Sequence, residues 1–116
     1  MTIEQIAQAA YEANLQYCLS IGDESQLSWD FAPPWQKEST ILGVMFLVEH
    51  PDVSPEQIHE HWVQQKIDTG WIYGPVKDAN KKEHPCIMPF RQLPDEQQVK
   101  DILFVDTINS LKDQLV

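Results

Sequence analysis

Eight prolines set the limits of every long regular element in this 116-residue chain; they stand at positions 33, 34, 51, 55, 75, 85, 89 and 94. Proline lacks a backbone N–H and disrupts a helix anywhere beyond its first turn. Long helices are therefore confined to residues 1–32, 34–50, 55–74 and 94–116. Residues 75–89 hold three prolines, which predicts a different structure between the third and fourth helical segments.

Capping residues place the ends of the first and third helices. Thr2 and Gln5 fit a capping box, in which each side chain accepts a hydrogen bond from the backbone N–H of the other residue, so the first helix begins near Thr2. Gly22 is a natural C-terminal stop for it. Ser54 and Gln57 form a second capping box at the start of the third helix.

Prolines and a glycine define the remaining helix ends. Pro34 suits the first position of the second helix, as Pro55 does for the third, because the fixed φ and missing N–H are tolerated there. Pro51 ends the second helix, since the residue before a proline is pushed out of the helical region. Gly70 ends the third helix, and the fourth is expected to begin after Pro94.

Apolar residues recur close to the helical period of 3.6 in all four segments, which predicts one buried face on each helix. Trp29 and Phe31 are expected to anchor the loop at 23–33 to the body of the fold. The residues expected on the four apolar faces are Ile3, Ile6, Ala7, Ala10, Tyr11, Leu15, Cys18, Leu19, Trp35, Ile41, Leu42, Met45, Phe46, Val48, Ile58, Trp62, Ile67, Val99, Ile102, Leu103, Val105, Ile108, Leu111 and Leu115.

Two short extended pieces, residues 71–76 and 85–88, are expected to form a β-hairpin around a loop at 78–80. The prolines in this region cannot donate to a sheet ladder, so the hairpin must be short and lie at an edge. The predicted fold class is mainly α with a small β-hairpin (α+β), with about four helices around one core. Residues 1–116 are expected to form a single domain.

The formal net charge of −10 counts against nucleic acid as a partner, because such binding depends on lysine and arginine neutralising phosphates. It also counts against anionic membranes. The longest apolar run, residues 41–48, is far shorter than the roughly 18–20 residues that span a bilayer. The first residues lack the basic start and apolar stretch of a secretory signal, so we expect a cytoplasmic protein.

Positive charge is concentrated in one segment of this acidic chain. Five of the eight basic residues lie between positions 66 and 91: Lys66, Lys77, Lys81, Lys82 and Arg91. These charges either form an anion-binding surface or only solvate a loop. Composition does not separate the two interpretations.

Four tryptophans are many for this length. Trp35 and Trp62 fall on apolar helix faces and are expected in the core, where each ring buries a large area. Trp71 differs, because it follows a helix-ending glycine and lies close in sequence to Tyr73 and Lys77. An exposed ring beside a cation can hold a flat anionic heterocycle; the alternative is that Trp71 plugs the structure.

Catalytic and metal-binding motifs fit poorly. His59 and His61 are two residues apart and point in different directions on a helix, and a zinc site from Cys18, His84 and Cys86 has no supporting pattern. A thiolate–imidazolium pair of Cys86 with His84 has no orienting third residue. The four glycines form no phosphate-binding loop. We therefore expect that the protein is not an enzyme and that it binds neither a cofactor nor a metal ion.

The segment from Gly70 to Pro94 carries a family resemblance. Its residues are Gly70-Trp71-x-Tyr73-Gly74-Pro75-Val76-Lys77-Asp78, then Lys81-Lys82-x-His84-Pro85-Cys86-x-x-Pro89-Phe90, then Leu93-Pro94. This pattern resembles the Ryr domain. Residues 33–39, 43–46 and His59-Glu60-x-Trp62 are similar to stand-alone bacterial and phage members, and the resemblance covers about residues 6–111.

The resemblance implies a cytoplasmic regulatory module. Ryr domains occur in tandem in ryanodine-receptor calcium-release channels, and nucleotide-like ligands have been associated with them. This chain has neither a second repeat nor the inserted loop that carries phosphorylation in some receptor copies. Calcium gating and phosphorylation control are therefore not expected here.

These observations predict a non-enzymatic regulatory or sensor module that binds a small anionic heterocycle, such as an adenine nucleotide, at the hairpin. The alternative is a protein–protein interaction or homodimerisation module with no small ligand, because a lone copy can form a two-fold dimer in place of the tandem pair. The expected ligand-binding residues are Trp71 and Tyr73 for stacking, Lys77, Lys82 and Arg91 for charge, and His84 from the resemblance.

Overall fold

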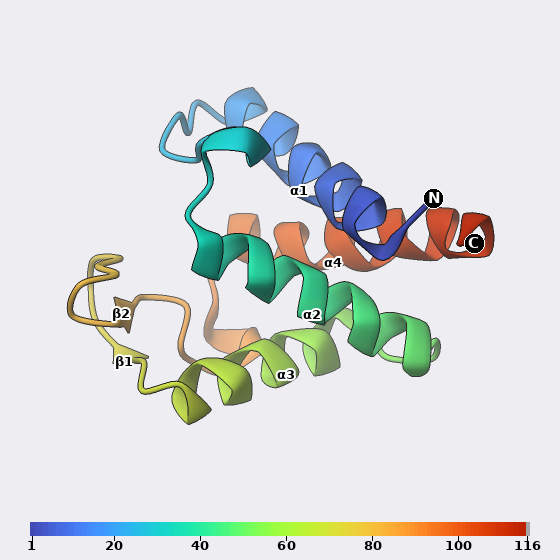
Figure 1. The fold of residues 1–116 in the computed structure, drawn as a ribbon. Coiled ribbons are helices and arrows are strands. Elements are labelled where there is room, and N and C mark those ends of the chain that lie inside the picture. Colours follow the sequence, from blue (N-terminus) through green and yellow to red (C-terminus); the bar gives the residue numbers. More distant parts are fainter. Residues whose placement is uncertain (116) are drawn as a thin grey trace.

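Four helices pack around one core in the computed structural model, which describes residues 1–115 (Figure 1). They are α1 (Ile3–Ser20), α2 (Pro34–Glu49), α3 (Pro55–Asp68) and α4 (Asp95–Leu111). Short 3-10 turns lie at Trp29–Phe31, Phe90–Gln92 and Lys112–Gln114, and two strands, β1 (Ile72–Tyr73) and β2 (Glu83–His84), form the small sheet. The mainly α fold with four helices and a small β part is confirmed.

The helix ends follow the sequence signals. Both capping boxes form, at Thr2 with Gln5 and at Ser54 with Gln57. Proline occupies the first turn of α2 and of α3. Gly22 and Gly70, just beyond the ends of α1 and α3, have φ values of +82° and +92°, a backbone conformation that glycine adopts without steric penalty. Local sequence therefore fixes these boundaries.

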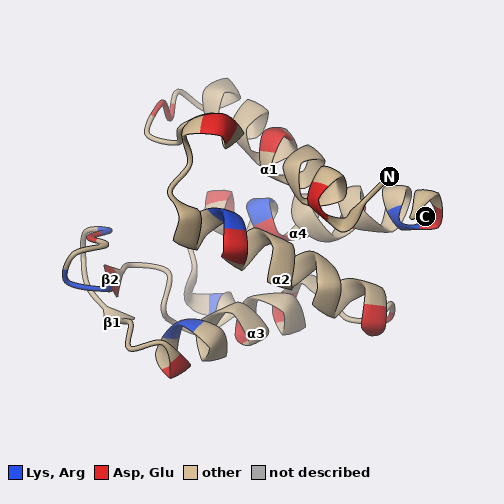
Figure 2. Ribbon diagram, viewed as in Figure 1, with Lys and Arg blue, Asp and Glu red and all other residues tan. Residues whose placement is uncertain are grey.

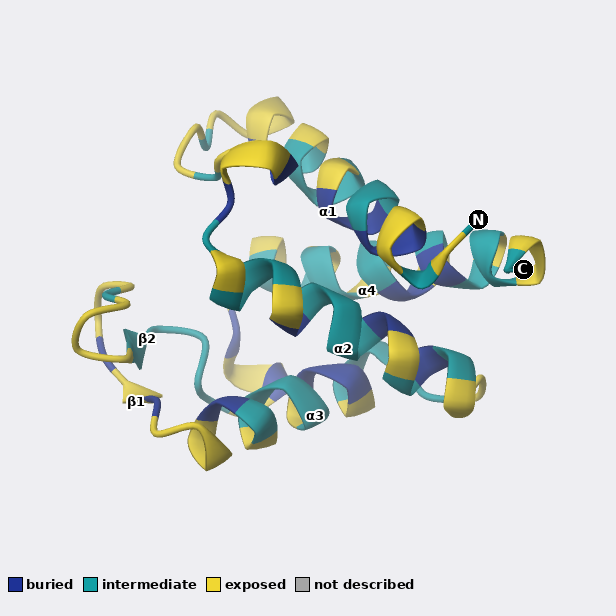
Figure 3. Ribbon diagram, in the orientation of Figure 1, coloured by how far each residue is buried: buried dark blue, intermediate teal, exposed yellow. Residues whose placement is uncertain are grey.

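The core lies where α1 crosses α4 and α2, and α3 closes it from the other side of α4 (Figure 3). Its members are small or aliphatic on α1 and aliphatic on the other helices, with the Tyr11 and Trp29 rings in an edge-to-face contact at 5.4 Å. The buried core residues are Ile6, Ala7, Ala10, Tyr11, Trp29, Ala32, Val44, Leu47, Ile58, Val105 and Ile108.

Several residues expected on the apolar faces are exposed instead. Phe31 is 76% exposed, so only Trp29 anchors the loop that precedes α2. A surface helix buries a stripe of about 100°, and residues on the flanks of that stripe stay in contact with water. The expectation of burial is wrong for Leu19, Met45, Ile67, Val99 and Ile102.

The two strands pair in parallel, not as the expected antiparallel hairpin. Ile72 is opposite Glu83 and Tyr73 is opposite His84. The chain turns back at Asp78, which forms an antiparallel bridge with Glu83, and Lys82 takes a φ of +54° beside it. The second extended piece lies at 83–84, before the expected residues 85–88. The expected loop at 78–80 is present, but the turn continues to Lys82 and β2 begins directly after it, which accounts for the different register.

The two ends of the described chain meet at one end of the bundle. The Met1 ammonium donates a hydrogen bond to the Gln114 carbonyl over 2.6 Å. Figure 1 places both termini away from β1 and β2, at the opposite side of the view. Within residues 1–115, no helix is both long enough and apolar enough to cross a bilayer.

Candidate ligand-binding cavity

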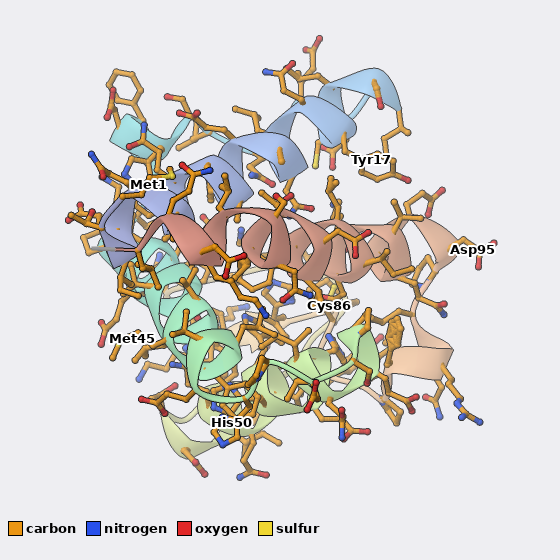
Figure 4. The ribbon with its side chains drawn as sticks, turned by 90° about the vertical axis from the view of Figure 1, so that its right-hand side faces the viewer. Met1, Tyr17, Met45, His50, Cys86 and Asp95 are labelled. Carbon is orange, nitrogen blue, oxygen red and sulfur yellow. The ribbon has the colours of Figure 1, made fainter. Side chains whose placement is uncertain are left out.

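A cavity of about 220 Å³ lies among the helices and the segment that follows β1. All four helices contribute to its wall, with Asn14 from α1, Trp35 from α2, Trp62 from α3 and Lys100 from α4 among the lining residues. Lys77, His84 and Cys86 complete it from the β region. Figure 4 labels Cys86, which lies near the middle of that view, in the region between α3 and α4. The wall thus combines aromatic rings, amides and cations.

Lys66 lies beside this cavity in a cage of three tryptophans. Its ammonium nitrogen is 5.0 Å from the ring centroid of Trp35, 5.5 Å from that of Trp71 and 6.0 Å from that of Trp62. The residue is only 5% exposed. Burial lowers the pKa of this amine below its usual value, although the Glu38 carboxylate acts in the opposite direction. The cage therefore holds a largely desolvated cation by cation–π attraction.

A second ammonium approaches the same indole from the loop between β1 and β2. Lys77 Nζ is 5.1 Å from the Trp35 centroid. The residue as a whole is exposed, but desolvation of its ammonium beside the ring lowers its pKa. Figure 2 shows basic residues on this loop and on the neighbouring end of α3. No ion pair among residues 1–115 involves Lys66 or Lys77. Two cations thus share one ring, and the carboxylates of Glu38 and Asp23 act on them only at distances longer than an ion pair in the described part of the chain.

His84 places a neutral imidazole in the cavity wall. Its Nδ1 accepts a hydrogen bond from the Cys86 backbone N–H at 3.0 Å, so the neutral ring carries its proton on Nε2. The ring packs edge-on against Trp62 with centroids 4.9 Å apart. Burial lowers the pKa of His84 to about 4, and the charges of Lys77 and Lys66 add to the effect.

His59 differs from His84 in that its pKa is raised. Its Nε2 lies 2.8 Å from the Met88 carbonyl oxygen and its Nδ1 lies 3.3 Å from an Asp101 carboxylate oxygen. Both partners are acceptors, so satisfying both requires the imidazolium, which donates from each nitrogen. Burial alone lowers the pKa of His59, but the bonds to Asp101 and Met88 outweigh it and the net shift is upward. This pair ties α3 to α4 and to the 86–89 segment.

One buried acceptor in the cavity has no partner. The Asn14 side-chain oxygen is buried and accepts no hydrogen bond from any residue that the structure describes, while the amide nitrogen of the same side chain donates weakly to the Ala10 carbonyl at 3.4 Å. Buried polar atoms are nearly always hydrogen-bonded in native structures. This oxygen is therefore an unused acceptor on a residue that lines the cavity.

The structure separates the six expected site residues. Lys77 and His84 line the cavity. Trp71 is 6% exposed and packs on Trp35 with centroids 4.9 Å apart, so it holds the cavity wall from behind and offers no free face for stacking. Its burial follows from packing between α2 and α3, which its place in the sequence did not reveal.

The other three lie outside the cavity. Tyr73 is 55% exposed on β1. Lys82 donates to the Thr69 carbonyl at 2.9 Å, which fixes the turn. Arg91 lies 3.6 Å from Glu56 across the surface. The structure therefore does not bring Tyr73, Lys82 or Arg91 to the ring and cations that surround the cavity.

Sequence reasoning missed Lys66, Trp35, Lys100 and the His59–Asp101 pair as site residues. One signal was available for Lys66, because Trp62 stands four residues earlier on the same helix and such pairs are neighbours on a helix surface. The pairing of His59 with Asp101 joins positions 42 residues apart, so only the tertiary structure could reveal it.

A metal site is not a feature of this region. Among residues 1–115, no group of three or more histidine, cysteine, aspartate and glutamate side chains is arranged to hold a metal ion. Cys18 and Cys86 are both free thiols.

Comparison with known families bears on the same part of the chain. The family model described as the RyR domain matches residues 46–112. The match includes α3, both strands and α4, and with them Lys66, Lys77 and His84, whereas Trp35 stands before it. It begins later than the expected start near residue 6 but still covers more than half of the chain. This chain belongs to the RyR domain family.

Proposed function

We propose that this protein is a non-enzymatic regulatory module that binds a small planar anion in the cavity between α2, α3 and α4. The cavity, and not the exposed strand region, is the proposed site. Trp35 and Trp62 provide aromatic surface, and Lys77 with Lys66 provides positive charge. Lys100 adds a third ammonium at the wall.

The single observation that carries the proposal is the pair of ammonium groups over Trp35, at 5.0 and 5.1 Å from its centroid. Each cation is partly desolvated, and each repels the other. In a chain with a net charge of −10, carboxylates that could neutralise them are abundant, yet none of those in the described residues pairs with them. A bound anion would relieve this repulsion.

The size and polarity of the cavity indicate what the anion carries. A volume of about 220 Å³ is below the roughly 300 Å³ at which sites for drug-sized molecules begin. It suits one ring system with one anionic group. The unpartnered Asn14 oxygen favours a ring with an N–H donor, and adenine nucleotides meet both requirements.

The chemistry of Cys86 and His84 supports a binding role over catalysis. Nucleophilic cysteine requires a lowered thiol pKa, whereas burial raises the pKa of Cys86. Its histidine neighbour has a pKa of about 4 and is neutral near pH 7. A thiolate–imidazolium pair needs both shifts in the opposite directions.

Calorimetry with adenine nucleotides tests the proposal. We expect binding of an adenine mononucleotide by the native chain and a loss of about tenfold in affinity for Lys77→Met, as expected for removal of an ionic contact to the ligand. Lys81→Met is the matched control, because it removes the same charge from the same exposed loop away from the cavity wall. No binding at millimolar nucleotide, or equal losses in both variants, would refute the proposal.

A second candidate function is association with another copy of the chain through the strand region. Ile72, Tyr73 and Val76 are all exposed within five residues, and clustered exposed apolar side chains mark interaction surfaces. Light scattering at high protein concentration tests this. A strict monomer, or a dimer unaffected by Val76→Ser, would exclude this surface.

A further inference from the structure

We propose that the anionic group of the ligand binds at the Nε2–H of His84 and that a proton enters the site with it. The inference rests on the proposed function and specifies which end of the ligand lies where. The oxyanion would lie at His84, and the attached ring would lie between Trp35 and Trp62.

The first support is the hydrogen bonding of His84. The Cys86 backbone N–H occupies Nδ1 from within the same segment, at 3.0 Å. The ring therefore keeps its second nitrogen as a donor, and no hydrogen bond from that nitrogen is found among residues 1–115. The residue lines the cavity, so this donor is available to an oxyanion there. A neutral Nε2–H is a sound hydrogen-bond donor to carboxylate, phosphate or sulfate oxygens.

The second support is the set of charges that surround this ring. Lys66 and His84 contact the same two indoles, those of Trp62 and Trp71. The charged groups whose fields reach His84 come from every neighbouring element: Lys66 and His59 from α3, Lys77 from the loop after β1, and Lys100 from α4. No carboxylate within residues 1–115 is among the charges that act on His84, and Asp101 of α4 already bonds to His59. The thiol of Cys86 is neutral.

Binding of the anion is coupled to protonation of His84 because of these surrounding charges. In the absence of an anion the surrounding cations and burial keep the ring neutral, with a pKa of about 4. An oxyanion on Nε2 supplies the missing negative charge, which favours the imidazolium. By linkage, an anion that raises the pKa must itself bind more tightly to the protonated ring. The affinity for the anion should therefore rise as the pH falls from about 6 to about 4, through the raised pKa and then the unperturbed one.

Nitrogen-15 spectroscopy of the histidine side chains tests the site directly, on the full chain at about pH 5, one unit above the pKa of His84 in the absence of an anion. The probe is sulfate, which keeps its charge at this pH, against chloride at equal ionic strength. In chloride we expect His84 as the neutral Nε2–H tautomer. In sulfate we expect a shift toward the imidazolium that corresponds to a rise of one pKa unit or more, or at least tenfold tighter binding to the protonated ring.

Exposed His50 is the internal control, since it lies away from this cavity. A response of His84 without a matching response of His50 supports the site. Equal responses would show general screening, and an unresponsive His84 would also overturn the inference. Nucleotide binding that depends on Lys77 while His84 stays neutral would leave the proposed function standing and remove the inference. A sulfate response without any nucleotide binding would leave the inference standing and remove the proposed function.

His84→Asn gives a second test that does not depend on spectral assignment. The amide oxygen can replace Nδ1 as acceptor for the Cys86 N–H, and the side chain cannot titrate. We expect this variant to bind sulfate with an affinity that no longer rises between pH 6 and pH 4. An unchanged pH dependence would overturn the inference.

Discussion

Lys66→Met should make the protein more stable while weakening anion binding. Methionine keeps the length and volume of the side chain and can contact the three indoles through its sulfur, with about 0.3–1.5 kcal/mol per contact. The native ammonium gains about 0.5–2 kcal/mol from each ring, but its burial forfeits several kcal/mol of hydration. With Nζ 5.0 to 6.0 Å from the rings and no ion pair found in the described chain, we expect a net stabilisation of about 1 kcal/mol.

The pH dependence of this effect has a definite sign. The pKa of Lys66 is lowered in the folded protein from its usual 10.5. Between the two values the unfolded chain binds more protons, so native stability rises with pH across that interval. Lys66→Met lacks this gain. The advantage of the variant should therefore be largest near pH 7 and shrink toward pH 10.

Urea unfolding followed by tryptophan fluorescence and circular dichroism measures the difference, and a thermal melt should show a rise of about 4 °C for each kcal/mol. Lys81→Met, on the exposed loop, is the control and should change the free energy of unfolding by less than about 0.5 kcal/mol. A loss of more than 1 kcal/mol in Lys66→Met would refute the reasoning, because it would mean that the three rings depend on the cation for their arrangement.

Three further changes test separate parts of the fold. His59→Gln should destabilise below about pH 6.5 and progressively less as pH rises through the folded pKa, because the raised pKa of His59 gives stability only while the ring is protonated; urea titrations at pH 6 and 9 that show equal losses would contradict this. Trp71→Ala should lower the free energy of unfolding by about 3–5 kcal/mol, and Trp62→Ala, at a half-buried position, should lower it by less. A larger loss for Trp62→Ala than for Trp71→Ala would contradict this prediction. Gly74→Ala should lower the free energy of unfolding by about 1–3 kcal/mol, because a new Cβ would lie 2.5 Å from the Glu83 Cβ. An unchanged melting temperature would contradict this, since it would mean that the loop moves to accommodate the methyl group.

The Gly74 contact explains why glycine stands at this position. The glycines with positive φ are Gly22 and Gly70, so backbone torsion is not the reason at Gly74. Gly74 is required because β2 passes close to its α-carbon. Sequence pattern identifies a position that rejects side chains without telling whether torsion or a neighbour is the reason.

The helices were predictable because their limits are local. A capping box joins residues three apart, and a proline acts on its own turn, so Thr2, Ser54 and Pro34 carry their information without the rest of the chain. The strands were less predictable, because each has only two residues and their direction depends on how the chain reverses at 78–83.

The site was predictable only in part. Clustering of lysines pointed to the segment that carries Lys77 and His84, and both residues line the cavity. Trp71 is buried, as in the alternative that it plugs the structure, whereas Trp35 and Trp62, which were expected in the core, line the cavity. An amphipathic pattern assigns a residue to the buried face of a helix, but it does not tell whether that residue packs in the core or lines a cavity.

The contact between the Met1 ammonium and the Gln114 carbonyl has a consequence for how this fold can be built into larger assemblies. An entering and a leaving polypeptide would run side by side at that pole, so the unit can be spliced into a surface loop of a host without stretching either junction. Both junctions would lie on the side of the molecule away from the β strands in Figure 1, so the strand region would remain accessible.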